Sequence, residues 1–88
     1  MTYEVIFKPS ASRDFFRLPK DIQRQIDSRI LALVDNPRPH GVEKLKGQSE
    51  PLYRIRSGDY RIVYVIRDQT LLILVVRVQH RREVYRGL

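Results

Sequence analysis

The hydrophobic pattern of the chain changes its period at one place, the proline-containing stretch NPRPHG at residues 36–41. Before this stretch, apolar residues recur at helical spacing and form a single stripe: Ile22, Ile26, Ile30, Leu33 and Val34. After it, apolar and polar residues alternate with the period of two that is typical of strands. A chain that places helices first and strands afterwards is predicted to fold as an α+β domain.

The segment before NPRPHG is predicted to hold a strand and two helices. TYEVIFK, residues 2–8, alternates and predicts a strand that puts Tyr3, Val5 and Phe7 on one side. A turn at Pro9 follows, and then a first helix capped by one of two serines and carrying three apolar residues: Ser10 or Ser12 as the cap, with Ala11, Phe15 and Phe16.

The second helix is the clearer of the two. Pro19 suits its first turn, where the missing N–H of proline costs nothing. The polar residues between its apolar positions are expected to face water: Gln23, Arg24, Asp27 and Arg29. The helix is expected to end at Asn36–Pro37, because a residue before proline disfavours the helical conformation.

Three strands are predicted after the connector, at residues 51–56, 60–67 and 70–78, and the breaks between them are short enough for hairpins. The last strand, TLLILVVRV, hardly alternates, so it is expected to be central and covered on both faces. The predicted fold is therefore a single domain over residues 1–88 with the order β-α-α-β-β-β. Its two helices pack on one face of a small, mostly antiparallel sheet, and a short basic C-terminal tail follows.

The hairpin at Gly58–Asp59 predicts a register. With glycine first in a type II′ turn, the pairs are Ser57 with Tyr60, Arg56 with Arg61, Ile55 with Ile62, Arg54 with Val63, and Tyr53 with Tyr64. The arginines Arg54, Arg56 and Arg61 then share the face that points away from the helices. Two arginines directly opposite each other destabilise a sheet. Either an anion binds between them, or they splay into water or pair with a carboxylate such as Asp59.

Charge and composition limit the function. The chain has 88 residues, no cysteine and a formal net charge of +7. Almost all of the excess lies after residue 43, where ten Lys/Arg face four Asp/Glu. This basic half favours a polyanionic partner, nucleic acid above all, although a solvated basic surface remains the alternative. With no cysteine and no apolar run long enough to span a bilayer, we expect a cytoplasmic protein.

The closing stretch HRREVYR, residues 80–86, adds two rings that can move protons, His80 and Tyr85, to a cluster of cations. RNA cleavage by internal attack needs a base for the 2′-hydroxyl proton and cations for the phosphorane, and it needs no metal. His40, in the connector, is expected to be a surface or turn residue. The alternative is that HRREVYR is a solvated basic tail in which Tyr85 covers an edge of the core.

Three stretches together resemble the RelE branch of the RelE/ParE superfamily of bacterial and archaeal toxins: KLKG at residues 44–47, LYRIRSGDYRIVY at 52–64 and HRREVYR at 80–86. The resemblance covers essentially the whole chain. It implies a ribosome-dependent mRNA endonuclease that cuts the codon in the ribosomal A site and leaves a cyclic phosphate upstream. It also implies a cognate antitoxin that wraps the toxin and holds it inactive, and it implies no cofactor.

Carried over by position, the resemblance assigns roles to individual residues. Arg61 and Arg81 would hold the scissile phosphate and stabilise the phosphorane, and Tyr85 would orient or deprotonate the 2′-hydroxyl. The remaining basic residues would bind RNA: Arg54, Arg56, Arg82, Lys44 and Lys46. Gln79 stands where relatives often have glycine before the His80–Arg81 pair, which leaves open whether His80 or Tyr85 is the main base.

Two rival functions and a partner complete the expectations. A ParE-like poison of DNA gyrase shares the fold, and a non-catalytic nucleic-acid-binding module shares the charge. The partner expected from the charge is an acidic, RelB-like amphipathic segment in a hetero-oligomeric complex. It would cover apolar positions on the arginine face, namely Leu52, Val63 and Val65.

Overall fold

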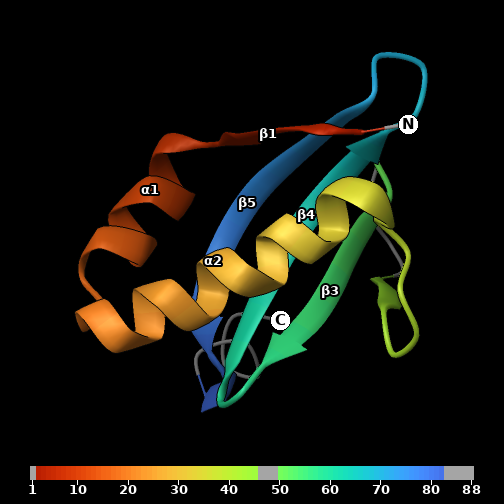
Figure 1. The fold of residues 1–88 in the computed structure, drawn as a ribbon. Coiled ribbons are helices and arrows are strands. Elements are labelled where there is room, and N and C mark those ends of the chain that lie inside the picture. Colours follow the sequence, from red (N-terminus) through yellow and green to blue (C-terminus); the bar gives the residue numbers. More distant parts are fainter. Residues whose placement is uncertain (1, 46–49, 83–88) are drawn as a thin grey trace.

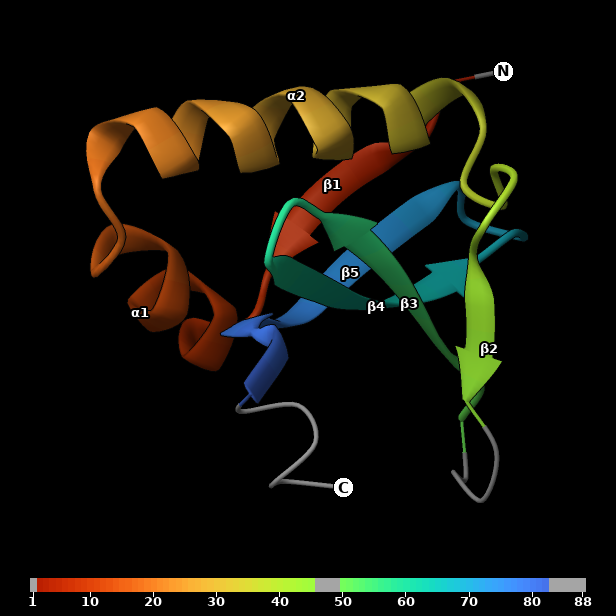
Figure 2. The same cartoon turned by 90° about the horizontal axis from the view of Figure 1, so that it is seen from below.

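The protein is described from a computed structural model, which covers residues 2–45 and 50–82. Its elements, in chain order, are β1 (Glu4–Phe7), α1 (Pro9–Phe16), α2 (Lys20–Asp35), β2 (Glu43–Leu45), β3 (Leu52–Ser57), β4 (Tyr60–Arg67) and β5 (Leu72–His80). The strands form one sheet in the order β1-β5-β4-β3-β2, in which only the β1–β5 pair is parallel. Both helices lie on the same face of this sheet (Figures 1 and 2). The predicted α+β class is confirmed, and β2 is an addition that the sequence pattern did not indicate.

β5 is central, as predicted, because β1 and β4 pair with its two edges. The helices cover one of its faces only, and this is where Ile73, Val75 and Val78 are buried. On the other face Leu74 is only half-buried, so the expectation of cover on both faces was wrong. The apolar side chains on that face explain why the segment shows so little alternation.

A β-bulge in β5 sets which residues of its second half face the core. Val63 pairs with Arg77 and Tyr64 pairs with Val75, so Val76 is the extra residue on β5. An extra residue shifts the alternation by one position. As a result Val78 joins the core and Arg77 leaves it. Without the bulge, strict alternation would place Arg77 under the helices, where a charged side chain is costly.

The first helix begins differently from the prediction. Pro9 is its first residue and Lys8 is the N-cap, with no side-chain cap. Proline suits this position, because the first N–H groups of a helix have no intrahelical acceptor. Ser10 instead donates a hydrogen bond from Oγ to the carbonyl of Val76, 2.9 Å away, and so fastens α1 to the bulge. Phe16 is 71% exposed, so it is not part of the core as its position suggested.

The second helix matches its predicted stripe, with Ile26, Ile30 and Leu33 fully or almost fully buried. Pro19 is the N-cap, one position before the first turn. Gln23, expected to face water, is buried, and its Nε2 donates to the carbonyl of Leu18 at 2.9 Å. This hydrogen bond compensates the burial and fixes the loop between the two helices.

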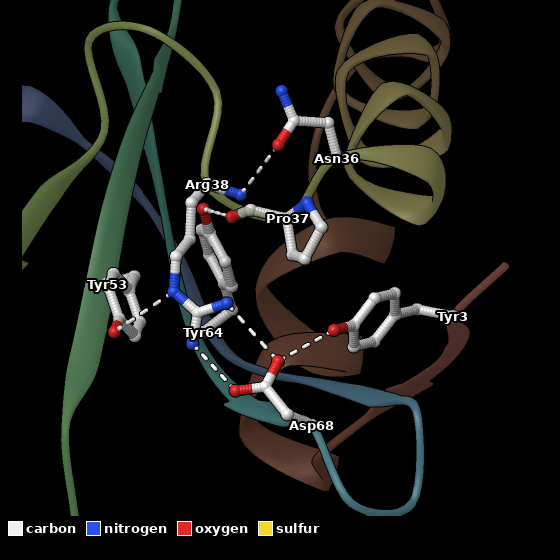
Figure 3. Close-up of polar contacts among 7 residues, drawn as sticks. All are labelled: Tyr3, Asn36, Pro37, Arg38, Tyr53, Tyr64 and Asp68. Carbon is white, nitrogen blue, oxygen red and sulfur yellow. Dashed lines mark hydrogen bonds and ion pairs between the residues drawn. The ribbon is translucent and has the colours of Figure 1, made fainter. Parts of the chain in front are cut away.

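A polar cluster joins three distant parts of the chain at the end of the sheet marked by the β4–β5 turn (Figure 3). The Asp68 carboxylate accepts a 2.6 Å hydrogen bond from the Tyr3 hydroxyl and bonds of 3.2 and 2.9 Å from Arg38. The Arg38 guanidinium also lies over the ring of Tyr53, 5.3 Å from its centroid. We call Tyr3, Arg38 and Asp68 the Asp68 clamp, because they tie the N-terminal segment to the connector and to this turn.

Tyr64 supports the same connector from the core. Its buried hydroxyl donates to the carbonyl of Pro37 at 2.7 Å (Figure 3). Burial raises the pKa of Tyr64 to about 12, so the hydroxyl keeps its proton at neutral pH. The connector is therefore fixed on both sides, which holds the edge strand β2 that follows it.

The clamp makes stability depend on pH. Hydrogen bonds from Arg38 and then Tyr3 hold the pKa of Asp68 below its usual 3.8. A lowered carboxyl pKa contributes stability above the unfolded value, and the contribution is lost as pH falls through the folded value. We therefore expect wild type to exceed Asp68→Asn in free energy of unfolding by a constant amount from about pH 5 to 9, and by less below about pH 4.

Tyr3 determines the alkaline pH at which the clamp loses part of its contribution to stability. The hydrogen bond to Asp68 is the main cause that raises the pKa of Tyr3 above 10.0, so its contribution is lost as pH rises through that raised value. Urea unfolding at a series of pH values measures both limbs. Asp27→Asn, which removes an exposed carboxylate from α2, is the matched control and should show no such profile. A wild-type advantage unchanged from pH 7 to pH 3 would disprove the role of the clamp.

Candidate nucleic-acid interface at the β3–β4 turn

The hairpin register predicted from the sequence is confirmed pair by pair, from Ser57–Tyr60 to Tyr53–Tyr64. Gly58 has φ +60°, which favours glycine, and Leu71 is the only non-glycine residue of positive φ in the described ranges, so Asp59 keeps a negative φ. These signs fit the predicted type II′ turn. An ideal Cβ on Gly58 would lie 3.3 Å from Oε1 of Gln25 on α2, so the helix also limits this position.

Arg56 and Arg61 stand directly opposite each other, and both turn toward the β3–β4 turn. Nε of Arg56 donates to the carbonyl of Gly58 at 3.1 Å. Nη1 of Arg61 donates to the same carbonyl at 3.5 Å and to that of Tyr60 at 3.2 Å. Neither guanidinium has a carboxylate partner within the described part of the chain. The two like charges are therefore gathered around one neutral oxygen, and pairing of either with Asp59 is excluded.

Arg81 reaches the same turn from the end of β5. Its backbone N–H donates to the carbonyl of Asp59 at 2.8 Å, and its Nε lies 4.0 Å from the Asp59 carboxylate. Both side chains are more than half exposed, so this ion pair is weak and a stronger anion can displace it. We call Arg56, Arg61 and Arg81 the turn cluster. Guanidinium groups arranged in this way can hold a phosphate through paired, charge-assisted hydrogen bonds.

α2 supports the turn cluster from the other face of the sheet. Nε of Arg29 donates to the carbonyl of Arg56 at 3.1 Å and thus fixes the backbone of β3 beside the turn. This role could not be predicted from the helical stripe, which identifies only the residues that face the core. Arg29 was expected simply to face water.

Arg54 lies on the same strand face as Arg56, but its charge is already paired. Its Nη2 is 2.7 Å from the Glu43 carboxylate on β2, and its side chain is only 16% exposed. Its Nε is buried without a hydrogen-bond partner among the described atoms. Arg54 therefore joins the edge strand β2 to the rest of the sheet.

The structure separates His80 and Lys44 from the turn cluster. His80 pairs with Tyr60, and their rings meet edge to face with centroids 5.3 Å apart. Tyr60 is on the helix-facing side of the hairpin, so His80 is across the sheet from Arg56 and Arg61. Lys44 pairs with Tyr53 and also lies on the helix-facing side. Arg82 is exposed beside His80, and its N–H donates to Nδ1 of His80 at 3.3 Å.

Two predicted site residues, Lys46 and Tyr85, lie outside the described residues. Within the described ranges, no three His, Cys, Asp or Glu side chains are grouped as a metal site would need. None of the described helices is both long enough and apolar enough to cross a membrane.

Comparison with known proteins identifies the class. The family model described as the ParE toxin of the type II toxin–antitoxin system, parDE, matches residues 5–85. A RelE-like toxin protein of Escherichia coli is 35% identical over 97% of this chain and 92% of its own length. The chain therefore belongs to the RelE/ParE superfamily of toxins from type II toxin–antitoxin systems, within which it is RelE-like.

Two further relatives also carry the RelE name. The mRNA interferase toxin RelE of Escherichia coli K12 is 29% identical over 97% of this chain and 92% of its own. The toxin in the archaeal RelE–RelB complex of Pyrococcus horikoshii superposes with a TM-score of 0.79 at 30% identity, covering 92% of this chain and 97% of that one. The resemblance predicted from the three motifs is thus confirmed.

Proposed function

We propose that this toxin is an mRNA interferase, an endoribonuclease that needs no metal and that acts as a single domain over residues 1–88. The observation that carries the proposal is the turn cluster, in which Arg56, Arg61 and Arg81 converge on one turn and, among the described residues, only the weakly held Asp59 carboxylate is paired with them. A relative across nearly the whole chain is named an mRNA interferase, which supports the same activity.

The proposed reaction is internal transfer at a phosphodiester. The 2′-oxygen attacks phosphorus as its proton passes to a base, the bond to the 5′-oxygen breaks, and that oxygen takes up a proton. Arg61 and Arg81 hold the phosphate and stabilise the charge of the phosphorane. Because His80 lies across the sheet, we assign the base to Tyr85. Arg54, Arg82, Lys44 and Lys46 would act on the RNA at longer range.

We further propose that cleavage takes place in the ribosomal A site and inhibits translation in the cytoplasm. A cluster built from arginines supplies charge stabilisation but no strong base, so it depends on an outside agent to align the 2′-hydroxyl for in-line attack. A ribosome that holds the codon provides such alignment. Naked RNA should therefore be cut very poorly.

The proposed partner is an acidic, RelB-like antitoxin in a hetero-oligomeric complex. The Pyrococcus relative is seen with RelB. Within the part of the chain that the structure describes, the three cations of the turn cluster are unpaired or weakly paired, so they can attract such a segment. The expected apolar contact surface is smaller than predicted, because Val63 and Val65 are already buried and only Leu52 is partly exposed. Charge rather than apolar area would dominate this contact.

The experiment that tests the function is primer extension on mRNA in programmed ribosomes, with a ribosome-free control. We expect cuts inside the A-site codon that appear only with ribosomes. Robust cutting of the naked transcript at equimolar toxin would refute ribosome dependence. No cutting by folded toxin in either arm would refute the nuclease.

The second candidate is a gyrase poison, which is favoured by the ParE name of the matching family model. A supercoiling assay with purified gyrase separates the two, because a nuclease should leave supercoiling unchanged. A plain binding module differs from both: its Tyr85→Phe variant would keep full activity, and its affinity for nucleic acid would fall steeply with salt.

A further inference from the structure

The chain changes from strand to helical turn at His80. β5 ends at this residue, and Arg81 and Arg82 have helical backbone. The first N–H groups of a helix have no acceptor within the helix, so they need partners elsewhere. Here the N–H of Arg81 donates to the carbonyl of Asp59 at 2.8 Å, and the N–H of Arg82 donates to Nδ1 of His80 at 3.3 Å. His80 therefore occupies the N-cap position, and its side chain accepts from the second helical residue, as N-cap side chains do.

The orientation of the His80 ring is fixed on the helix-facing side of the sheet. The ring is half-buried and meets the Tyr60 ring edge to face, with centroids 5.3 Å apart and planes at 86°. Histidine is an uncommon N-cap, because the short side chains of serine, threonine, aspartate and asparagine lead at this position. The contact with Tyr60 directs the longer imidazole, so that Nδ1 points at the Arg82 amide.

The cap limits how Arg81 leaves the sheet. Its own N–H is bonded to the β3–β4 turn, and the N–H of the next residue is bonded to His80, so the backbone is held on both sides of the Arg81 Cα. The Arg81 side chain therefore begins from a fixed point beside Asp59. A guanidinium that is oriented before the substrate arrives can stabilise a phosphorane without reorganising.

We propose that His80 is a positioning residue, which orients Arg81 for the phosphate by capping the helical turn through Nδ1. The proposal rests on the proposed function and gives His80 a role other than that of the base. Because Nδ1 accepts the Arg82 N–H, the neutral ring carries its own proton on Nε2. Neither nitrogen is then free to take the proton of a 2′-hydroxyl.

Two substitutions separate the cap from the ring. His80→Asn keeps a side-chain acceptor at the N-cap and removes the ring, whereas His80→Phe keeps a ring against Tyr60 and removes the acceptor. A typical N-cap side chain shifts the helical equilibrium about fivefold. We therefore expect single-turnover cleavage on programmed ribosomes to fall about fivefold in His80→Phe and to stay within about twofold of wild type in His80→Asn.

The other outcomes of this comparison contradict the cap. A loss in His80→Asn with none in His80→Phe would assign the residue to packing against Tyr60. Equal losses in both variants would overturn the proposal as well, and losses of several orders of magnitude would make His80 the base. Wild-type activity in both variants would show that the cap does not position Arg81.

An NMR titration of the ¹⁵N-labelled toxin from pH 5 to 8 tests the cap without ribosome or RNA. Histidine side chains ordinarily take up a proton in this range, and a protonated imidazole no longer accepts a hydrogen bond. We expect the amide proton signal of Arg82 to move upfield as pH falls in wild type, and to stay in place in both His80 variants. His40→Asn changes the other histidine of the chain, which is exposed in the connector, and should leave the Arg82 titration intact.

The groups around the ring make this signal specific for histidine. The charged or titratable side chains that line the same cavity are Asp14 and Arg17 of α1 and Tyr60 of β4, and Arg81 and Arg82 follow His80 in the chain. Side chains of these types ordinarily titrate outside pH 5–8. An Arg82 signal that does not respond to pH, or that responds equally in His80→Asn, would therefore overturn the cap.

The titration also separates this proposal from the nuclease. An Arg82 signal that follows pH in a toxin that cuts no mRNA would support the cap and refute the proposed function. Ribosome-dependent cutting by a toxin whose Arg82 signal ignores pH would do the reverse.

Discussion

Replacing Arg61 with alanine should reduce A-site cleavage by about 10²- to 10³-fold, as expected for the loss of one preorganised group that stabilises the charge of the transition state. Arg61 is half-buried, and its guanidinium is held against the Gly58 and Tyr60 carbonyls, so little reorganisation precedes its contact with a phosphate. Single-turnover cleavage on programmed ribosomes measures the effect.

The same strand provides a matched control. Arg67 is at the other end of β4, where it pairs with Glu50 at 3.1 Å. Arg67→Ala removes the same charge far from the turn cluster and should change cleavage by no more than about twofold, in the range of an exposed ion pair. Equal losses in the two variants would mean that net charge, and not the position of Arg61, determines activity. Arg61→Lys should be intermediate, because it keeps the charge but cannot bond bidentately.

Replacing Ile73 with alanine should lower the free energy of unfolding by about 2–5 kcal/mol, the range for large-to-small changes in a packed core. Ile73 is fully buried on β5, between β1 and β4 and under the helices. The free energy of unfolding of such a domain is only about 5–15 kcal/mol in total, so the variant should be close to unfolding. In a domain this small, such a loss lowers Tm by at least about 10 °C.

Ile6→Ala is the matched control for this core substitution. Ile6 is on β1 and 48% exposed, so the same chemical change should cost well under 1 kcal/mol. Urea unfolding of both variants gives the comparison. Similar losses at the two positions would show that the core is not centred on β5.

The β3–β4 hairpin was predictable because two independent signals agree there. Alternation fixes which residues share a face, and Gly58 fixes the turn that sets the register. The arginine face followed from these signals alone, and the structure reproduces each pair. Local rules sufficed because the two strands are adjacent in the sequence.

His80 shows where such rules fail. The bulge at Val76 inverts the alternation in the second half of β5, and it turns His80 away from the arginine face. Strict alternation from Ile73 would have placed His80 beside Arg61. The bulge keeps Arg77 out of the core, and the Ser10 hydroxyl of α1 donates a hydrogen bond to the carbonyl oxygen of Val76. We attribute the bulge to this tertiary contact, which the alternation of the sequence does not reveal.

Other residues were missed for a similar reason. β2 is three residues long, too short to show a period, and its pairing is set by the connector that Arg38 and Tyr64 hold. Gln23 was expected in water because amides are usually exposed, yet it lies within reach of the Leu18 carbonyl. β2 depends on distant parts of the chain, whereas the acceptor of Gln23 is a backbone carbonyl in the loop just before α2, which side-chain periodicity does not reveal.

The strand order also has a consequence for synthesis. β5 is made last among the described strands, yet β1 and β4 both pair with it. β1 therefore has no strand partner until β5 has emerged, and a sheet built on such distant pairing folds late. Arg81, which completes the turn cluster, follows β5 in the chain. A nascent copy thus lacks the assembled turn cluster while most of the chain is still being translated.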